Sequence, residues 1–264
     1  MNIVQKKRDD IRQNIGIFSR KLMMSSQVVE LCEEVATPKQ EEFLCRVLSE
    51  EIARRELSRK TRLLNRASFP VLKSFSEYDF TAIRFPPAFS KQELLSCRFI
   101  EEKNNLVLYG GVGTGKTHMA TALGAIACEM GNKVRFYTVT ELVLKLSEAH
   151  KAGTLERIVR DIKQLDLLIL DEWGYVPVDR EGSRLLFRII ADSYESKSLI
   201  LTTNLEFSKW GSIFTDEQMA AAMIDRLVHH GHLLMFESKS YRMTHALMRQ
   251  PAPSKKETRE EEKQ

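Results

Sequence analysis

The chain has 264 residues, enough for one large domain or for one domain with an appendage. Its 43% hydrophobic and 29% charged residues are those of an ordinary soluble globular protein. No apolar run reaches about 18 residues and no apolar segment follows the charged N-terminus, so the sequence indicates neither a membrane span nor a signal peptide. We therefore expect a cytoplasmic protein without a membrane partner.

The cysteines and histidines indicate no structural metal site. The cysteines number four, lie far apart and lack metal-ligand spacing, which favours reduced structural thiols over a disulfide framework. His229 and His230 are adjacent, but no carboxylate accompanies them at the spacing of a zinc site. The net charge of +4 permits nucleic-acid binding without requiring it.

Residues 1–75 form a first zone that is predicted to be almost entirely helical, because proline and glycine are rare in it. The stretch "TPKQ" predicts a helix start, with Thr37 as N-cap, Pro38 at the first helical position and Gln40 as capping-box partner. This helix is expected to run towards Asn65. One side of it carries Phe43, Leu44, Val47 and Leu48.

A basic segment, residues 54–73, lies within this zone. It contains seven cations against the single acid Glu56, a local charge of +6 (7 − 1). The cations are Arg54, Arg55, Arg59, Lys60, Arg62, Arg66 and Lys73. The residues allow two interpretations equally. One is a solvated helix face, the usual location of a charge run. The other is a contact with the phosphate backbone of nucleic acid. The segment has almost no balancing acids, and its binding to phosphates would release counterions, which favours this interpretation.

The rest of the chain is predicted to be a connector, an α/β domain and a tail. Residues 76–103 are the connector, interrupted by the prolines of "RFPPAFS" and ending in a short helix at about 91–102. Residues 104–248 alternate apolar strands with amphipathic helices, the α/β pattern. The expected strands are 106–109, 134–138, 167–170, 199–202 and 233–236. The expected helices are 116–130, 140–151, 154–164, 181–195 and 216–229. Thr215 and Gln218 form a predicted capping box at the start of the last helix. The charged residues 249–264 are predicted to be a disordered tail.

Glycines are concentrated in one segment, which fits the P-loop pattern G-x-x-x-x-G-K-[ST]. The segment is Gly110, Gly111, Val112, Gly113, Thr114, Gly115, Lys116 and Thr117. Its glycines let the loop wind tightly with N–H groups turned inward, and the helix that follows adds its positive N-terminal dipole. Lys116 is expected to reach the β- and γ-phosphates, and the Thr117 hydroxyl to bind Mg²⁺. The sequence therefore predicts a nucleoside triphosphate site.

Acidic residues follow the apolar run "LLIL" of residues 167–170. Asp171 and Glu172 are expected at the carboxyl end of a buried parallel strand, where ligands bind in open α/β sheets. The separation of 55 residues from Lys116 to Asp171 (171 − 116) suits a Walker A and Walker B pair. We expect Asp171 to hold magnesium, mainly through its water, and Glu172 to polarise the water that attacks the γ-phosphate. The second acid favours hydrolysis over simple retention of the nucleotide.

A second apolar strand, "LILTTN", ends in polar residues. Asn204 at its tip is placed to orient the attacking water or to sense the γ-phosphate. Asparagine is also common in the turns that follow strands, and the residue on its own favours this structural interpretation.

These motifs, in this order, resemble the AAA+ ATPases, in which a polar residue called sensor 1 follows Walker B. Longer segments narrow the resemblance to the IstB family of ATP-binding helper proteins of insertion sequences, related to the DnaC and DnaI helicase loaders. The segments are "LLILDEWGYVPVD", "LILTTNLEFSKWGSIFTD", "AAAMIDRLVHHGHLLMFESKSYRM" and the helical lead-in ending "LNRASFP" followed by "DFT". The resemblance covers about residues 10–248 and implies an α/β AAA+ P-loop NTPase core of three layers with a parallel sheet, preceded by a small helical domain.

The resemblance also implies roles for residues that spacing alone does not assign. Arg226 in "MIDRL" matches the arginine finger, which reaches the nucleotide of a neighbouring subunit. The residues alone also allow an exposed helix arginine that is paired with Asp225 or with the acids at 216 and 217. Arg242 in "SYR" matches sensor 2, although "SK" precedes it where many relatives have "GE". His118, beside the nucleotide-binding loop, is common in the family, and we interpret it as helix packing.

The resemblance therefore implies an ATP hydrolase with ATP and Mg²⁺ as cofactors that assists the transposase of the same element. It implies a homo-oligomeric ring or spiral on double-stranded DNA. In the family the N-terminal helical domain takes part in oligomer packing and DNA engagement, which favours the basic segment as a contact with the DNA backbone without sequence preference. Loops of the ATPase core are an equal alternative for this contact. The alternative is a DnaC-type helicase loader with the same core. A small-molecule kinase and an ATP-binding switch without hydrolysis are further alternatives.

Overall fold

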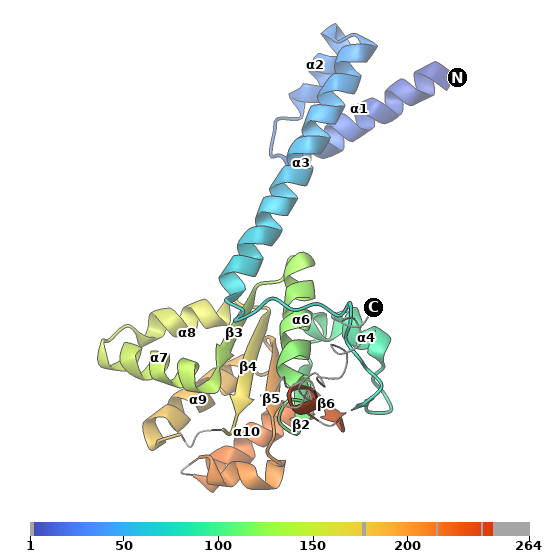
Figure 1. Ribbon diagram of the computed structural model, residues 1–264. Helices are drawn as coiled ribbons and strands as arrows, with labels where there is room; N and C mark the ends of the chain where they lie inside the picture. The colour runs from blue at the N-terminus through green and yellow to red at the C-terminus, as the bar shows by residue number, and fades with distance from the viewer. Residues whose placement is uncertain (1–2, 176–177, 215, 239, 245–264) are drawn as a thin grey trace, which may run out of the picture. The chain divides into compact units, whose positions relative to one another are not determined.

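The computed structural model (Figure 1) describes residues 3–175, 178–214, 216–238 and 240–244. It divides the chain into two compact units, Met1–Arg62 and Leu63–Gln264. Within the described ranges, no helix is both long enough and apolar enough to cross a membrane. The tail predicted at 249–264 lies outside these ranges.

The first unit is helical and consists of α1 (Ile3–Lys21), α2 (Gln27–Val35) and most of α3 (Pro38–Ala67). The predicted start of α3 at Pro38 is confirmed. The Thr37 amide donates a hydrogen bond to Gln40 Oε1 at 2.8 Å, as expected of a capping-box partner. The Thr37 hydroxyl donates to the same oxygen at 2.9 Å.

The apolar side predicted for α3 is only half buried. Leu48 is buried and Leu44 packs against the same small core, whereas 70% of Phe43 and 44% of Val47 are exposed. The buried side of α3 in this unit contains Glu41, Leu44, Cys45 and Leu48, whereas Phe43 and Val47 lie beside it.

A buried carboxylate joins the helices of the first unit. Glu41 on α3 is fully buried and accepts hydrogen bonds from Arg8 Nε at 2.8 Å and Arg12 Nε at 2.9 Å, both on α1. Arg8 also donates to the carbonyl oxygen of Ala36 at 3.0 Å. The hydrogen bond from Arg8, together with the Arg12 guanidinium, holds the pKa of Glu41 below its usual value.

The second unit begins inside α3, after Arg62. The sequence-based division had placed this boundary at residue 75. The structure places it earlier because Leu63 and Leu64 already pack against the core of the second unit, together with Phe69.

The second unit contains a six-stranded sheet in the order β1-β6-β2-β5-β4-β3. All neighbouring strands are parallel except β1, which is antiparallel to β6. The strands are β1 (Ile83–Arg84), β2 (Asn105–Gly110), β3 (Val134–Thr138), β4 (Leu167–Trp173), β5 (Ser198–Thr203) and β6 (Gly231–Phe236). The five predicted strands are all present. β1 was missed because a two-residue strand within the connector has no periodicity to detect.

Helices cover both faces of this sheet (Figure 1). One face packs against α6 (Lys116–Glu129), α4 (Lys91–Leu95) and α5 (Arg98–Glu101). The other face packs against α7 (Val139–Lys151), α8 (Leu155–Lys163), α9 (Arg180–Ser193) and α10 (Glu217–His229). Side chains of β4 alternate between the faces, with Leu167 and Ile169 on the α6 side and Leu168 and Leu170 on the other. The predicted three-layer α/β fold is confirmed.

Local differences from the predicted elements have identifiable causes. The helix expected at 91–102 is divided into α4 and α5, because Cys97 adopts a left-handed φ of 53° between them. The N-cap of α10 is Asp216, whose carboxylate accepts from the amides of Gln218 and Met219. The predicted cap, Thr215, lies outside the described residues. Two short helices complete the unit, η1 (Phe207–Ser212) and α11 (Tyr241–Thr244).

Candidate active site

The glycine-rich loop connects β2 to α6 and depends on two glycines in the left-handed region. Gly113 has φ 77° and Gly115 has φ 97°. A Cβ on Gly113 would collide with the Ser240 hydroxyl, and a Cβ on Gly115 would lie 3.0 Å from the Tyr78 hydroxyl oxygen. Only glycine satisfies both the backbone angle and the space at these positions.

Lys116, the first residue of α6, lies across the concave side of the loop. Only 6% of it is exposed, and its ammonium group donates to the carbonyl oxygens of Gly110 at 2.8 Å and Gly111 at 2.6 Å. The positive charge is therefore held inside the loop at the N-terminus of α6, where helix N–H groups also favour an anion. This arrangement suits a bound triphosphate.

The next residue, Thr117, contacts the acidic end of β4. Its hydroxyl donates to the Asp171 carboxylate, with distances of 3.0 Å and 3.1 Å to the two oxygens. Only 4% of Asp171 is exposed. A hydroxyl and a buried carboxylate in contact form the all-oxygen donor set that Mg²⁺ prefers, with water and phosphate completing its shell. In the described part of the chain no cluster of three His, Cys, Asp or Glu side chains offers a competing metal site.

A β-bulge at the end of β4 gives the two acidic residues different directions. The β4–β5 register shifts between Leu170 and Trp173, and Glu172 within the bulge has a left-handed φ of 62°. Asp171 is buried while Glu172 is exposed. Bulges beside active sites commonly redirect a side chain in this way.

Thr202 on β5 connects both acids, and the sequence analysis did not identify it. Its hydroxyl oxygen accepts the Glu172 N–H at 3.0 Å, and the hydroxyl donates to Asp171 Oδ1. The detectable signal was a pair of threonines, Thr202 and Thr203, directly after the apolar run of β5. The role of Thr202 became visible only once β5 was placed beside β4.

Asn204 follows the end of β5, which lies between β2 and β4 in the sheet. Asn204 therefore lies at the same edge of the sheet as the P-loop and Asp171. Asn204 Oδ1 is buried and has no hydrogen-bond partner among the described residues. A buried acceptor without a partner is unusual and fits a residue that binds a ligand or an ordered water.

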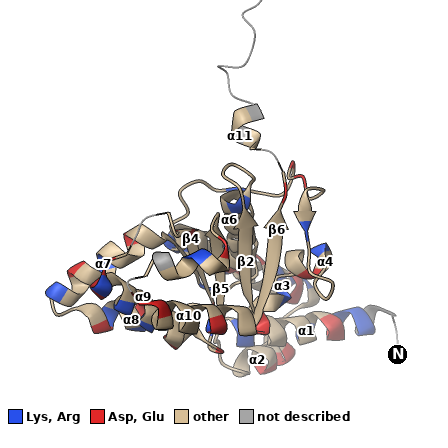
Figure 2. Cartoon of the chain, turned by 90° about the horizontal axis from the view of Figure 1, so that it is seen from below, with Lys and Arg blue, Asp and Glu red and all other residues tan. Residues whose placement is uncertain are grey.

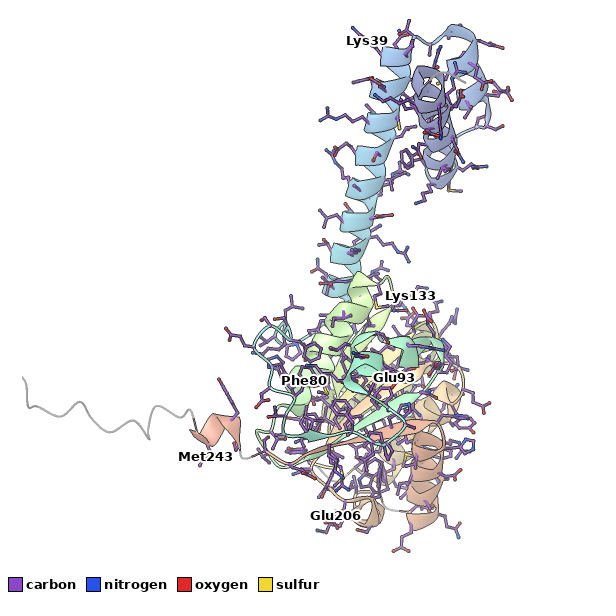
Figure 3. All side chains as sticks on the ribbon, turned by 90° about the vertical axis from the view of Figure 1, so that its right-hand side faces the viewer. Lys39, Phe80, Glu93, Lys133, Glu206 and Met243 are labelled. Carbon is purple, nitrogen blue, oxygen red and sulfur yellow. The ribbon has the colours of Figure 1, made fainter. Side chains whose placement is uncertain are left out.

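The connector also packs against the P-loop, which the sequence analysis did not foresee. The Tyr78 hydroxyl donates to the Gly115 carbonyl oxygen at 3.1 Å, and burial raises the pKa of this phenol, so it stays a donor. The Tyr78 ring packs against Phe75 and Phe80, the latter labelled in Figure 3. His118 Nε2 lies 2.7 Å from the carbonyl oxygen of Ser74. The centre of the His118 ring also lies 4.9 Å from that of the Tyr78 ring, so His118 faces residues 74–78, and its role in packing stays a prediction.

The last described helix also contacts the loop. The Tyr241 N–H, at the start of α11, donates to the Gly113 carbonyl oxygen at 2.9 Å. This contact places the backbone of Arg242 near the P-loop, whereas the Arg242 side chain lies outside the described part of the structure.

Arg226 lies far from the P-loop of its own chain. It is half-buried on α10, donates to the Ala222 carbonyl oxygen at 2.8 Å and has its guanidinium 5.2 Å from the Phe187 ring centre. The adjacent Leu227 carbonyl accepts from the side chain of Asn105, the first residue of β2. The P-loop follows the other end of this six-residue strand, about 20 Å away.

The alternative considered for Arg226 was an ion pair with a neighbouring acid. Among the described residues, no salt bridge joins Arg226 to Asp225, Asp216 or Glu217. The guanidinium instead packs on an aromatic ring.

The cations proposed for DNA contact are exposed along α3. They are Arg54, Arg55, Arg59, Lys60 and Arg62 in the first unit and Arg66 in the second. Arg55 forms an ion pair with Glu51 at 2.7 Å, one turn away. An exposed basic surface fits both a solvated face and a phosphate contact.

The fold and the site define the class of the protein. The carboxyl edge of a mainly parallel sheet, between helical layers, brings together a P-loop, an Asp-Glu pair and a polar strand end. The protein is therefore an AAA+ ATPase that hydrolyses ATP. The chain belongs to the family of IstB-like ATP-binding proteins, whose sequence profile matches residues 23–248.

Individual relatives agree with this assignment. The chain is 37% identical over 225 residues to the ATP-binding protein named for insertion sequence IS21 in Pseudomonas aeruginosa, covering 83% of this chain and 84% of the relative. It is also 37% identical to the ATP-binding protein named for insertion sequence IS5376 in Geobacillus stearothermophilus, covering 76% of this chain and 80% of the relative.

Solved structures with a similar fold include two proteins of lower identity. The DnaC helicase loader gives a TM-score of 0.48 at 22% identity, covering 55% of this chain and 88% of DnaC. DnaI gives a TM-score of 0.49 at 19% identity, covering 68% of this chain and 92% of DnaI.

Proposed function

We propose that this AAA+ ATPase binds double-stranded DNA without sequence preference and assists the transposase of the same insertion sequence. ATP binding drives assembly of a ring or spiral on DNA, and hydrolysis resets it. The observation that carries the proposal is the kinship with ATP-binding proteins named for insertion sequences, which extends over most of both chains. The same kinship favours transposition over helicase loading.

The P-loop residues bind the triphosphate. Lys116 and the N–H groups at the start of α6 compensate the phosphate charge, and Thr117 with Asp171 holds Mg²⁺. When bound, the ion supplies charge neutralisation at the β- and γ-phosphates. The contact between the Thr117 hydroxyl and the Asp171 carboxylate supports this role, since both would offer oxygen donors to one ion.

The residues at the strand ends act on the attacking water. Glu172 accepts the proton of this water. Asn204 orients the water through its buried amide oxygen, or contacts the γ-phosphate through its amide N–H groups. Thr202 holds both acidic residues in position, because its hydroxyl group binds the Glu172 N–H and the Asp171 carboxylate. Arg242 contacts phosphate from the same subunit as sensor 2.

Arg226 completes the site of a neighbouring subunit as an arginine finger. Its place at the opposite end of β2 supports this role, because it cannot reach the nucleotide of its own chain. Hydrolysis therefore requires a homo-oligomer. The basic face of α3, from Arg54 to Arg66, contacts the DNA backbone.

The test is nucleotide-dependent DNA binding by the full chain. Anisotropy of a labelled duplex at low salt should report binding that is at least about fivefold tighter with a non-hydrolysable ATP analogue than with ADP. This is the lower limit expected for a coupling of about 1–3 kcal/mol. Lys116→Ala should abolish this difference because it removes the phosphate contact. Wild-type protein without ATP-dependent DNA binding would overturn the proposal. Co-purification with a replicative helicase instead of the transposase would replace it by helicase loading.

A further inference from the structure

The second unit contains a cavity that the ATPase reaction does not use. It has a volume of about 460 Å³ and lies beside the first residues of β3 and the last residues of α8. Charged side chains are prominent in its lining, namely Arg66, Lys133, Arg135, Lys145 and Asp161. Lys133, labelled in Figure 3, immediately precedes β3. The cavity is large enough for a ligand the size of a nucleotide.

The charge of this lining is uncompensated. Four cations face one carboxylate, and none of the four forms an ion pair among the described residues. A further acid, Asp166, lies at the start of β4 but accepts the Lys133 backbone N–H at 2.7 Å. The surfaces of α7 and α8, by contrast, intersperse both signs of charge (Figure 2).

One cation of the cavity has an unsatisfied buried donor. Arg135 donates through Nη1 to the Arg66 carbonyl oxygen at 2.7 Å, while its Nε is buried and has no partner among the described residues. A buried donor without a partner costs free energy unless a ligand or water accepts its hydrogen bond. The hydrogen bond to Arg66 also fixes the guanidinium in place, so the cavity is built before any ligand arrives.

The cavity is separate from the nucleotide site. β3 is the edge strand, and β4 and β5 lie between it and β2, which carries the P-loop. The cavity is lined by residues of α3, β3, α7 and α8 and of the segments beside β3 and α8, and no residue of the P-loop is among them. One ATP molecule cannot occupy both.

We propose that this cavity binds the phosphodiester backbone of a nucleic-acid strand. The inference rests on the DNA binding proposed above and names a second place where the DNA is held. Three or four cations around a solvent-accessible hollow match a phosphate-rich strand, because each neutralised phosphate releases counterions. Arg66, one of the cations of the basic segment, belongs to the second unit and contributes to the cavity lining.

The aromatic residue of the cavity favours backbone contact over base recognition. The Tyr137 ring centre lies 5.2 Å from the guanidinium of Arg135 and 5.2 Å from the ammonium of Lys145. Lys145 also donates to the Tyr137 hydroxyl at 3.2 Å. The Tyr137 ring thus orients two cations instead of offering a free face for base stacking. DNA binding at the cavity should therefore not depend on the base sequence.

The experiment compares two triple variants of the full chain that lose the same charge. The cavity variant is Lys133→Gln, Arg135→Gln and Lys145→Gln, and the matched control is Arg157→Gln, Arg160→Gln and Arg184→Gln, all exposed and outside the cavity lining. Duplex affinity is measured from 0.05 to 0.2 M salt. The cavity variant should reduce the slope of log K against log[salt] by about 2 to 3, and the control by less than about 1.

Several outcomes decide the inference. Equal slopes for wild type and the cavity variant, or equal losses in both variants, would overturn it. Wild-type protein that does not bind DNA at all would overturn the proposed function instead. The double variant Lys133→Gln and Lys145→Gln, which keeps the Arg135–Arg66 bond, guards against misfolding and should still lose a slope of about 1 to 2.

Inorganic pyrophosphate distinguishes a strand site from a site for a free phosphate compound. With the P-loop saturated by ADP, pyrophosphate should compete with DNA in the wild type and have little effect on the cavity variant. Saturable pyrophosphate binding at the cavity that leaves DNA affinity unchanged would contradict the strand assignment.

Discussion

At the scale of single residues, Thr202 determines the geometry of the acidic pair. Glu172 has a left-handed backbone conformation that costs roughly 1 kcal/mol or more for a residue other than glycine, and neighbouring contacts must maintain it. The Thr202 hydroxyl supplies one such contact and binds Asp171 as well. Loss of this one oxygen therefore affects both Asp171, the proposed magnesium ligand, and Glu172, the proposed general base.

Thr202→Val should lower kcat for ATP hydrolysis by about 10²-fold, because the base shifts relative to the attacking water. The affinity for ATP should change by less than about threefold, since the P-loop is untouched. Phosphate release and equilibrium binding of a fluorescent ATP analogue measure the two quantities. Thr202→Ser retains the hydroxyl and should restore most of kcat. A valine variant with wild-type kcat would show that the hydroxyl is dispensable.

Lys197 should make the stability of the second unit depend on pH. It is 2% exposed, its ammonium donates to the Ile162 carbonyl oxygen, and burial lowers its pKa from 10.5 to about 8. Between pH 8 and 10.5 the unfolded chain therefore holds one more proton than the folded chain, so stability rises with pH. The rise due to this residue should reach about 3 kcal/mol.

Denaturant unfolding of wild type and Lys197→Met from pH 7 to 10 measures this contribution. The difference in unfolding free energy between the two proteins should move in favour of wild type as pH increases. A constant difference across this range would contradict the assigned pKa.

At the scale of elements, the first unit depends on a polar contact because its apolar core is small. Glu41 joins α3 to α1 through two arginines, while exposed apolar side chains such as Phe43 remain outside the core. Removing one partner from a buried charged cluster costs more than removing an exposed pair, since the remaining charges lose their compensation.

Glu41→Gln should lower the Tm of the first unit by roughly 5–10 °C, since a small domain loses about 4–8 °C per kcal/mol. The matched control is the neighbouring Glu42, which is half exposed and pairs with Lys7 at 3.3 Å. Glu42→Gln should change Tm by less than about 3 °C. Helical circular dichroism or hydrogen exchange in α1 reports the change. Equal effects of both variants would contradict a special role of Glu41.

The pH dependence due to Glu41 has the same sign as that due to Lys197, because both pKa values are lowered in the folded state, but it falls at acid pH. The pKa of Glu41 is lowered in the folded state, so its contribution is full above the unfolded pKa of 4.5 and disappears as pH falls through the lower folded value. Acid titration of the wild type should therefore destabilise the first unit more than it destabilises the Glu41→Gln variant.

The strands and most helices of the second unit could be predicted because each has its own hydrophobic period and turn residues. The P-loop and the Asp171–Glu172 pair could be predicted for a similar reason, since their chemistry lies in contiguous motifs. Thr202, Tyr78 and the cavity beside β3 could not be predicted. Their roles depend on which strand or segment lies next to them, and a single sequence contains no direct record of that.

At the scale of the whole molecule, the two halves of the proposed catalytic site lie at opposite ends of β2. The P-loop follows its carboxyl end, and Arg226 lies near its amino end. Each chain is therefore expected to give an arginine to one neighbour and to receive one from another. Such a contact is heterologous and builds a ring or a helical filament.

Mixing two inactive variants tests this sharing. Arg226→Ala and Glu172→Gln should each reduce hydrolysis by about 10³-fold while leaving ATP binding intact. In an equal mixture, activity should return to roughly one quarter of wild type, because half of the sites keep Glu172 and half of their neighbours keep Arg226. Phosphate release measures the recovery, and Lys116→Ala mixed with Glu172→Gln, which leaves no complete site, should stay inactive. An equally inactive Arg226→Ala mixture would exclude an arginine shared between subunits.

The separation of Arg226 from its own P-loop also gives any open assembly a direction. One terminal subunit would hold ATP that no arginine reaches, and the other would present an arginine that no ATP meets. Turnover would then be slowest at one defined end, and nucleotide would persist there after the interior has converted to ADP. A filament of identical chains would in this way acquire two chemically distinct ends, one of which could mark a position on DNA for longer than the other.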